Sequence, residues 1–469
     1  NKKLWVSSYL THGISNIFYP LLMWKIFAVE SIGATRTFTI FLVLILKLLS
    51  VMLSYQFTKI TNLKKETKIL FFTIFTAIII SMSNYTFLGA SYYISHKDIY
   101  IILFLIFFIE LFIDSRFRTL SLVSVCSIAT VSILLQIDKG FYINFILFFY
   151  SLYLVLAKKY KNFLLIFFSL VLCWSIVIGF LGLEEFKAFL SNGKTIILTM
   201  DLLHGLKYPT PFFSLENNPD GARATRGLLL QISAGLFILN YLISNKSNIF
   251  CSQKVLFIFL LLLSLIMYKN ALGRSDAPHI RDSTDMPILI NCFFILNYIF
   301  IFFSKRLFSS KLVFSLSIFF LLFYYTFNAN HYNIENIKNY KKNFTYLINL
   351  EDEIFLNQKT LNLIKYYSEL TKNENCVENI TFFNAMPYLL KKPSCTKYWA
   401  SVILGPIIVQ KDYIDRLEKV NPKYILYSSA NLELDGVGLY KRIELVNSYV
   451  LSNYKKYSEF DNYIILEKK

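Results

Sequence analysis

The segment from Lys269 to Asp285, KNALGRSDAPHIRDSTD, concentrates ionisable side chains between two long apolar stretches. Ionisable groups at a membrane border are costly unless they are paired, solvated or used, so this segment is a candidate functional site. The alternative is a hydrated loop in which Arg274 and Asp276 form a local ion pair. No second histidine lies at ligand spacing from His279, which argues against a zinc site. The candidate substrate-binding residues of this segment are Arg274, Asp276, His279, Arg281 and Asp282.

Asp98 and Asp138, which lie in two earlier connections, are the candidate catalytic residues. Carboxylates act as general bases or as ligands of a divalent metal ion, and arginines bind phosphate through paired hydrogen bonds. These groups suit the transfer of a sugar from a lipid phosphate, in which a base activates the acceptor hydroxyl and cations hold the departing phosphate. Three further residues are candidates for substrate binding, namely Lys139, Arg223 and Arg226.

Simpler structural roles compete with catalysis at both acids. Asp98 precedes an apolar run and could cap a helix over 99–113. Asp138 could pair with Lys139 in a tight turn with the sequence DKG. Inside the expected spans, Lys47 and Glu110 are interpreted as packing or snorkelling residues.

The composition identifies an integral membrane protein. The chain has 469 residues, of which 55% are hydrophobic and 17% aromatic, too apolar for one soluble domain of this length. The net charge of +18 comes largely from lysines in short connections. That distribution is typical of cytoplasmic loops and not of a nucleic-acid-binding surface.

Apolar windows and charged connections predict the topology of the first 327 residues. Every second connection is basic, beginning with TKITNLKKETK, and all five basic connections are expected to be cytoplasmic. With an outside start, the C-terminal part then also lies outside. The windows predict about ten spans, near 37–57, 69–89, 99–113, 119–136, 142–157, 163–183, 227–244, 255–269, 287–304 and 312–327.

Two segments outside these spans are expected to lie at the membrane surface. Residues 1–36 contain six aromatic residues spaced for an interfacial helix, and the chain, which begins at Asn1 without Met, is interpreted as lacking its true start. The long outside connection 184–226 begins with an amphipathic helix. Its second half, YPTPFFSLENNPDGARATRG, is predicted to be a loop of turns because of its prolines and glycines.

The remaining segment, 328–469, is predicted to be a small exoplasmic α/β domain. Helical periodicity alternates with short apolar strands, which indicates a mainly parallel sheet. The run YKRIELVNSYVLSNYKKY is expected to be helical throughout and FDNYIILEKK to be the last strand. Cys376 and Cys395 are predicted to form a disulfide, with two buried thiols as the alternative. No phosphate-binding glycine motif follows any strand.

The whole pattern resembles the polytopic GT-C glycosyltransferases, which use polyprenyl-phosphate sugars. The resemblance lies in the many spans, the basic cytoplasmic turns, the outside acids and the C-terminal α/β domain. The run WVSSYLTHGISNIFYPLLMWKIF is similar to the segment after the first outside acid of such enzymes, and ALGRSDAPHI is similar to a late arginine motif. The family places a catalytic acid in its first outside loop, whereas residues 1–29 contain neither Asp nor Glu. That acid then lies upstream of Asn1, or this chain lacks the activity. By position, Asp98 matches an acid of the second outside loop.

The resemblance implies a glycosyltransferase of the bacterial inner membrane, with its C-terminal domain in the periplasm and a polyprenyl-phosphate-linked sugar as donor. A transporter or flippase of lipid-linked sugars is the main alternative, but it should bury charges in mid-span between repeats. A non-catalytic membrane assembly protein is the third interpretation.

Overall fold

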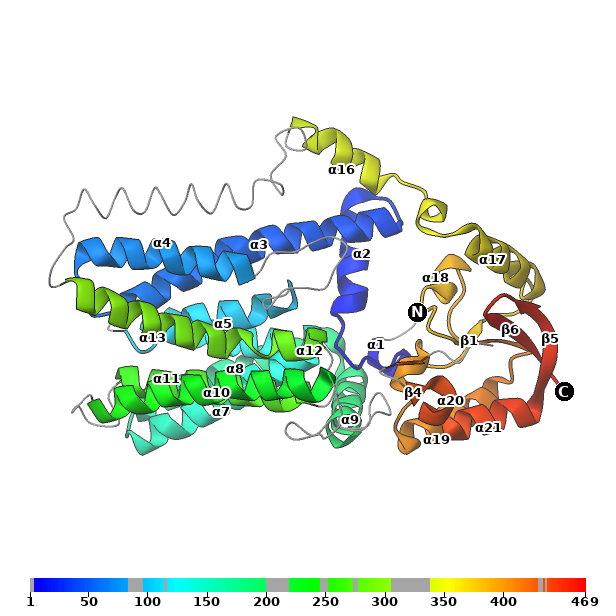
Figure 1. The fold of residues 1–469 in the computed structure, drawn as a ribbon. Helices are drawn as coiled ribbons and strands as arrows, with labels where there is room; N and C mark the ends of the chain where they lie inside the picture. Colours follow the sequence, from blue (N-terminus) through cyan, green and yellow to red (C-terminus); the bar gives the residue numbers. More distant parts are fainter. Residues whose placement is uncertain are drawn as a thin grey trace. The chain divides into compact units, whose positions relative to one another are not determined.

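The computed structural model describes residues 4–82, 96–113, 116–199, 219–244, 252–272, 277–304, 338–428, 433–434 and 437–469. The chain divides into two compact units (Figure 1). The first unit contains residues 1–11, 177–208 and 351–469. The second, which holds most of the apolar helices, contains residues 12–176 and 209–350.

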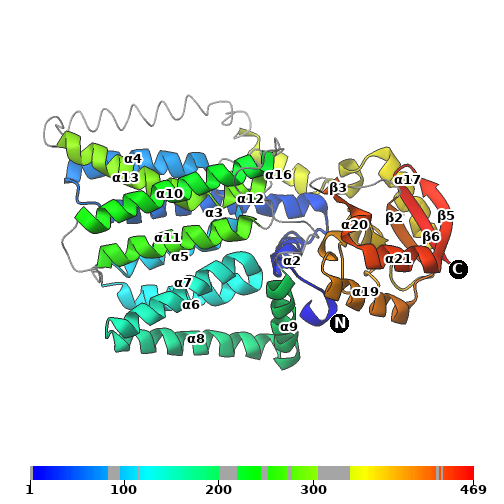
Figure 2. The ribbon, with the colours of Figure 1, turned by 60° about the horizontal axis from the view of Figure 1, so that its bottom comes forward.

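Among the described residues, seven helices are long and apolar enough to cross a membrane. This agrees with an integral membrane protein. Figure 2 shows α10, α11, α7 and α6 in successive rows, each helix packing against the next. The seven helices are α3 (Ile32–Lys59), α6 (Arg118–Leu135), α7 (Ile137–Leu156), α8 (Tyr160–Leu181), α10 (Pro219–Ser244), α11 (Ser252–Ala271) and α13 (Asp285–Ser304).

Three of the ten predicted spans do not correspond to one of these seven helices. The helix α4 (Lys65–Met82) covers the beginning of the window 69–89, whose end lies outside the described residues, as does the whole of 312–327. The helix α5 (Ile99–Glu110) has only 12 residues. It is shorter than a straight membrane crossing requires.

The helix α3 begins at Ile32, five residues before its predicted start at 37. The hydroxyl of Ser31 accepts a hydrogen bond from the backbone N–H of Ala34 at 3.0 Å, which caps the helix. The hydropathy window missed this polar first turn, since Gly33, Thr35 and Arg36 are not apolar.

The predicted N-terminal surface helix is α2 (Ser15–Phe27), which runs across the direction of α3 (Figure 1). Tyr19 of α2 forms a hydrogen bond with the hydroxyl of Tyr100 in α5. Phe18, Leu21 and Ile26 remain exposed. An apolar exposed face on a helix that crosses the bundle direction is what an interfacial helix needs.

The amphipathic start of the long connection was predicted correctly; of the predicted turns, 208–218 lie outside the described residues, and 219–226 were predicted wrongly. The helix α9 (Leu183–Thr199) is amphipathic and buries Glu185, Phe189, Asn192 and Ile196 on one face. The segment expected to be turns up to 226 already enters α10 at Pro219. Proline is favourable in the first helical turn, where its missing N–H costs nothing, so it does not mark a break here.

The C-terminal region forms a four-stranded sheet in the order β1-β2-β6-β5. Only β1 and β2 are parallel, so the prediction of a mainly parallel sheet was wrong. The sheet lies between α17 (Gln358–Leu370) on one side and α19 (Ile407–Val420) with α21 (Glu444–Asn453) on the other (Figure 1). The strands are β1 (Glu378–Ile380), β2 (Tyr424–Ser428), β5 (Tyr454–Phe460) and β6 (Tyr463–Lys468).

The segment expected to be one long helix before the last strand is divided. The helix α21 ends at Asn453, and Tyr454–Phe460 forms the edge strand β5, which pairs with β6 in a hairpin. Asp461 adopts a positive φ of 54° at the turn. Aspartate tolerates this conformation better than most residues. The sequence Asp461–Asn462 is therefore consistent with a hairpin turn, whereas the prediction followed the helical spacing of the preceding apolar residues.

A disulfide joins Cys376 and Cys395, the predicted pair, with their Cα atoms 4.9 Å apart. It closes the chain at the start of β1, where the Cys395 N–H donates to the Val377 carbonyl at 3.1 Å.

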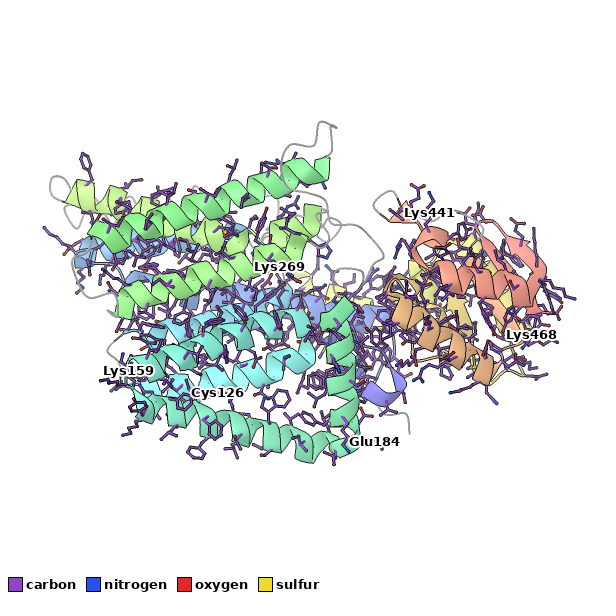
Figure 3. The ribbon with its side chains drawn as sticks, turned by 90° about the horizontal axis from the view of Figure 1, so that it is seen from below. Cys126, Lys159, Glu184, Lys269, Lys441 and Lys468 are labelled. Carbon is purple, nitrogen blue, oxygen red and sulfur yellow. A yellow bond between two sulfur atoms is a disulfide. The ribbon has the colours of Figure 1, made fainter. Side chains whose placement is uncertain are left out.

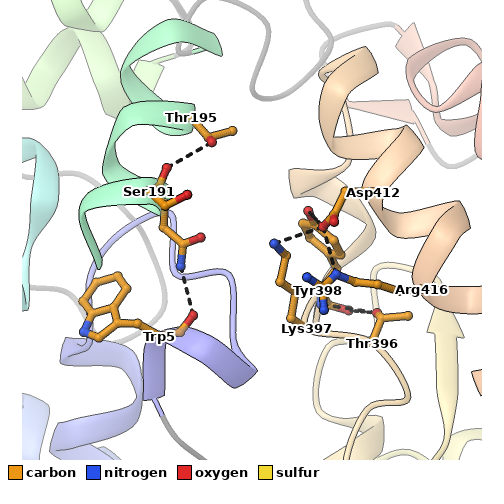
Figure 4. Close-up of polar contacts among 9 residues, drawn as sticks. Trp5, Ser191, Thr195, Thr396, Lys397, Tyr398, Asp412 and Arg416 are labelled. Carbon is orange, nitrogen blue, oxygen red and sulfur yellow. Dashed lines mark hydrogen bonds and ion pairs between the residues drawn. The ribbon is translucent and has the colours of Figure 1, made fainter. Parts of the chain in front are cut away.

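The N-terminal residues belong to the same unit as this sheet and contact two of its parts. The backbone N–H of Trp5 donates to Glu185 of α9 at 2.6 Å, and the Asn192 side chain donates to the Trp5 carbonyl (Figure 4). A few residues later, the Tyr9 N–H donates to the carbonyl of Lys397. Lys397 itself pairs with Asp412 of α19 at 3.0 Å.

Candidate functional site

Four of the predicted site residues meet at one end of the apolar helices. Asp98 ends a short 3₁₀ turn, His96–Asp98, immediately before α5, and Asp138 and Lys139 lie in the first turn of α7. Asp282 ends α12 (Ala277–Asp282). We call these residues, together with Asp285 at the start of α13, the charged cluster. The Lys139 ammonium interacts electrostatically with Asp98, Asp138 and Asp282, and Asp285 interacts with Asp98, Lys139 and Asp282.

The closest contact of the cluster is the ion pair between Lys139 and Asp98. The Lys139 Nζ lies 2.5 Å from Asp98 Oδ1, and the two side chains are 7% and 0% exposed. Asp98 occupies the position before α5 but makes no capping hydrogen bond to that helix. Its side chain therefore serves the ion pair with Lys139 and not the helix end.

The backbone around Lys139 is fixed by a tight junction between α6 and α7. Residues 138–140 form the first turn of α7, so the predicted alternative of an isolated DKG turn is wrong. A side chain at Gly140 would place its Cβ 2.2 Å from the Cα of Ile133 in α6. Only glycine allows this approach, which directs the neighbouring Lys139 toward Asp98.

The segment around His12 is hydrogen-bonded to the same junction. The Ile14 N–H donates to the Leu134 carbonyl at 3.0 Å, and the Gln136 side chain donates to the Ser15 hydroxyl at 2.6 Å. His12, Lys97 and Lys139 are positive groups that act on Asp138. His12 was not among the predicted site residues, because nothing in the sequence relates a residue near the N-terminus to the α6–α7 junction.

The late segment brings Asp282 and Asp285 to the cluster through a short connection between α12 and α13. The hydroxyl of Ser283 donates to the carbonyl of Ile280 at 2.8 Å, and that of Thr284 donates to Arg281 at 2.9 Å. The Asp285 carboxylate accepts the N–H of Met286 at 2.6 Å and is 3% exposed. The bond to Met286 fixes the Asp285 carboxyl, and the two hydroxyl bonds hold the backbone of the connection that follows Asp282.

The Asp282 carboxyl is partly buried and faces the charge of Asp98. Burial raises the pKa of Asp282 to about 7, and the charge of Asp98 acts in the same direction. Lys139, Lys97 and His279 oppose this rise. A carboxyl group with a pKa near neutrality is suited to general acid–base catalysis.

The wall of the site beside α12 comes from α10 and α11. Ala224, Tyr268, Ala271 and Ile280 form a small buried apolar group, and the Tyr268 hydroxyl donates to the Ala224 carbonyl at 2.6 Å. Arg223 therefore lies on a helical turn of α10 that contacts α12. Nearer to Lys139, the Asn270 side chain donates to the hydroxyl of Tyr142.

The structure groups the predicted candidates as follows. Asp98, Asp138, Lys139 and Asp282 come together, and His279 acts on Asp282 from within α12. Arg281 lies on α12 beside Asp282, whereas Arg223 and Arg226 are on α10. Arg274 and Asp276 lie outside the described residues.

The cluster and the basic connection around Lys159 lie at opposite ends of α7. In Figure 3 the label of Lys159 locates the basic connection, and the label of Lys269 locates the cluster end of α11. Lys269 is in the last turn of α11, near the cluster end of that helix. The opposite ends of the helices also hold an ion pair of their own. Lys59 lies 2.9 Å from Glu110, the last residue of α5, so Glu110 is paired and not simply snorkelling.

Within the described ranges, no group of three His, Cys, Asp or Glu side chains is arranged to hold a metal ion. No protein-family model, curated protein or solved structure matches this chain.

Proposed function

We propose that the protein is a membrane glycosyltransferase that moves a sugar from a polyprenyl-phosphate donor to an acceptor hydroxyl. The observation that carries this proposal is the charged cluster, in which buried acids and a buried lysine gather at one end of apolar helices. A reaction between a lipid-anchored donor and a polar acceptor needs such groups at the level of the lipid headgroup. Ionisable residues buried there are costly and are retained where they serve a function.

The cluster provides the groups that sugar transfer requires. A carboxylate accepts the proton of the acceptor hydroxyl while that oxygen bonds to the sugar C1, and the bond from C1 to the phosphate oxygen breaks. Asp98 and Asp138 are the candidate catalytic acids. Cations must stabilise the departing phosphate, and Lys97, His279 and Arg281 are near the carboxyls for this role.

A flippase of lipid-linked sugars is favoured less by this arrangement. Transporters of that kind bind substrate near the middle of the membrane, at interrupted helices. All five residues of the charged cluster instead lie at helix ends. This position favours chemistry at the membrane surface over passage through the membrane.

The decisive experiment compares two conservative variants at opposite ends of α5. Asp98→Asn removes the acid that pairs with Lys139 in the cluster, and Glu110→Gln removes the acid of the other ion pair. The 12 residues of α5 separate these sites by about 18 Å. Radiolabelled transfer from polyprenyl-phosphate sugars is measured in membranes that contain equal amounts of each protein.

We expect Asp98→Asn to lower transfer by about 100-fold or more, as for removal of an acid–base group, and Glu110→Gln to retain most of it. Equal activity in both variants would separate the cluster from catalysis. No transfer by the wild-type protein from any polyprenyl-phosphate sugar, together with lipid-linked sugar crossing vesicles that contain it, would favour the flippase.

The proposal places the protein in a bacterial inner membrane, with the cluster and the C-terminal α/β domain on the periplasmic side. The disulfide between Cys376 and Cys395 supports an oxidising compartment for this domain. A reporter that is active only in the periplasm, fused after Lys469, should be active. Activity of a cytoplasm-specific reporter at the same point would invert the topology.

A further inference from the structure

The helix α9 begins one residue after the end of a candidate membrane span. The 22 residues of α8 extend for about 33 Å, which matches a hydrocarbon core about 30 Å thick. This helix ends at Leu181, and Gly182, with a φ of 82°, is the single residue before Leu183. Glycine adopts that backbone conformation at little cost. The first turn of α9, which the label of Glu184 locates in Figure 3, therefore starts at the level of the lipid headgroups.

One face of α9 is covered by the N-terminal segment of its own compact unit. The residues buried on this face are Glu185, Phe189, Asn192 and Ile196. The ring of Trp5 meets that of Phe189 edge to face, with the ring centroids 5.0 Å apart. The backbone N–H of Trp5 donates to Glu185 at 2.6 Å. This face of the helix is thus occupied by protein.

A second face of α9 is apolar and exposed. Leu183, Leu190 and Ile197 follow one another at intervals of seven residues, and their side chains are 60%, 51% and 58% exposed. At 3.6 residues per turn, the three positions lie within about 40° of one another around the helix. We call these three residues the apolar row. A row of large apolar side chains that the protein leaves uncovered indicates a contact with another apolar surface.

Two lysines border the apolar row. Lys187 and Lys194 are exposed, and each follows a leucine of the row by four residues, which places it about 40° to one side. Among the described residues, neither lysine belongs to an ion pair. Ser191 and Thr195, labelled on α9 in Figure 4, lie farther round on the same side. The surface of α9 thus changes from apolar to basic to hydroxyl-bearing, as in helices that lie at a membrane surface.

We propose that α9 docks on the bilayer surface, with the apolar row among the first acyl carbons and with Lys187 and Lys194 at the phosphates of anionic lipids. Lysine suits this border because its hydrocarbon stem rests on apolar surface while its ammonium group reaches the headgroups. Lipid fits this face better than a second copy of the chain. The row starts where α8 leaves the hydrocarbon core, and pairing two such faces would bring four lysines into one interface.

Docking of α9 also holds the α/β domain at the membrane, because the N-terminal segment joins the two within one compact unit. The Asn192 side chain donates to the Trp5 carbonyl at 3.1 Å. Four residues later, the Tyr9 N–H donates to the Lys397 carbonyl at 2.9 Å, and the Trp399 indole donates to the Tyr9 carbonyl at 3.2 Å. The N-terminal segment is therefore bonded both to the docked helix and to the domain that follows it in the unit.

The test is electron paramagnetic resonance of nitroxide labels on α9. The full-length protein is reconstituted into vesicles of phosphatidylcholine and phosphatidylglycerol. Leu190→Cys and Ile197→Cys place labels in the apolar row, and Ser191→Cys, at an exposed residue beside Leu190, is the matched control. Collision rates are measured with oxygen, which concentrates in the bilayer, and with a water-soluble nickel chelate. The four cysteines outside the disulfide are first replaced by alanine, namely Cys126, Cys173, Cys251 and Cys292.

We expect the ratio of the oxygen to the nickel collision rate to be several-fold higher at positions 190 and 197 than at position 191. Slow collision with both reagents at 190 and 197 would show that another protein surface covers the row. Faster collision with nickel than with oxygen at these positions would show that the row faces water. Either result would overturn the docking, and two label positions keep the test decisive if one variant fails to fold.

The role of the lysines is tested by combining Lys187→Gln and Lys194→Gln with the label at position 190. In the anionic vesicles the ratio of docked to undocked label should fall by about fivefold for each lysine removed. In vesicles of phosphatidylcholine alone the double change should have no effect. Lys411→Gln with Lys419→Gln, at exposed lysines of α19, removes the same charge and should leave the ratio unchanged. An unchanged ratio in the α9 double variant, or an equal fall in both double variants, would overturn the contact with anionic headgroups.

Discussion

Glu378 offers a quantitative test of burial in the α/β unit. This carboxyl is 1% exposed, lies in β1, and accepts a hydrogen bond from the Tyr413 hydroxyl at 2.9 Å. Burial raises its pKa from 4.5 to about 7, against the opposing effects of the Tyr413 hydroxyl and nearby backbone N–H groups. The folded state therefore binds the proton more tightly than the unfolded state.

The sign of the pH dependence follows from this difference. Between pH 4.5 and about 7 the folded state holds a proton that the unfolded state has released, so the free energy of unfolding falls as the pH rises. Above about 7 the full loss is present, roughly 3 kcal/mol for a difference of about 2.5 pKa units. From about pH 6 to about pH 8 the loss amounts to about 1.3 kcal/mol, or nearly tenfold in the opening equilibrium.

Hydrogen exchange of the β1 and β2 amides in the full-length protein measures this opening, after correction for the intrinsic pH dependence of exchange. We expect wild-type opening to increase nearly tenfold between about pH 6 and about pH 8. In Glu378→Gln the increase should vanish, and the sheet should be more stable at the higher pH. Glu459→Gln, in the exposed hairpin of the same sheet, is the control and should behave as wild type. The same pH dependence in Glu378→Gln and wild type would refute this reasoning.

Three further outcomes are expected. Lys139→Met leaves Asp98 buried without its partner and should lower the free energy of unfolding by about 3 to 5 kcal/mol. Lys59→Met should lower it much less, because the Lys59 side chain is 28% exposed. Equal thermal stability of the two variants would contradict the importance of burial. Gly140→Ala places a Cβ 2.2 Å from a backbone atom of α6 and should reduce the yield of folded protein. Gly235→Ala, with no atom within 4 Å of its Cβ, should not reduce it. Size-exclusion chromatography compares the two variants, and normal elution of both would show that the α6–α7 junction can relax. Alkylation of Cys376 and Cys395 should require prior reduction, and labelling that is unchanged by reductant would count against the disulfide.

The sequence was most informative where one period or one composition dominates a segment. The long apolar runs predicted most of the helices, and the amphipathic period of α9 was correct to within a residue at its start. Prediction failed where a local rule has two structural meanings. Proline at 219 begins a helix instead of ending one, and the run before Phe460 continues as a strand although its apolar spacing also fits a helix.

The candidate site shows a different limit. Asp98 and Asp138 could be nominated because acids between apolar runs are rare, but their relation to each other could not be deduced. The pairing of Asp98 with Lys139 depends on α5 and α7 lying together, and no local pattern encodes that contact. Asp285 was visible in the same charged segment, three residues after Asp282. It was passed over because the apolar window 287–304 starts two residues later, which left Asp285 as one more residue of the loop.

The positions of the acids at helix ends also explain why one carboxyl differs from the rest. Asp98, Asp138 and Asp285 lie at the N-terminal ends of α5, α7 and α13, where unpaired backbone N–H groups favour negative charge. Asp282 lies at the C-terminal end of α12, where carbonyl groups disfavour it. The end of α12 thus acts on Asp282 in the same direction as burial and the charge of Asp98, which raise the pKa of Asp282 to about 7. A conservative change there, Asp282→Asn, should therefore alter the proton affinity of the site more than Asp138→Asn, although both remove one acid from the same cluster.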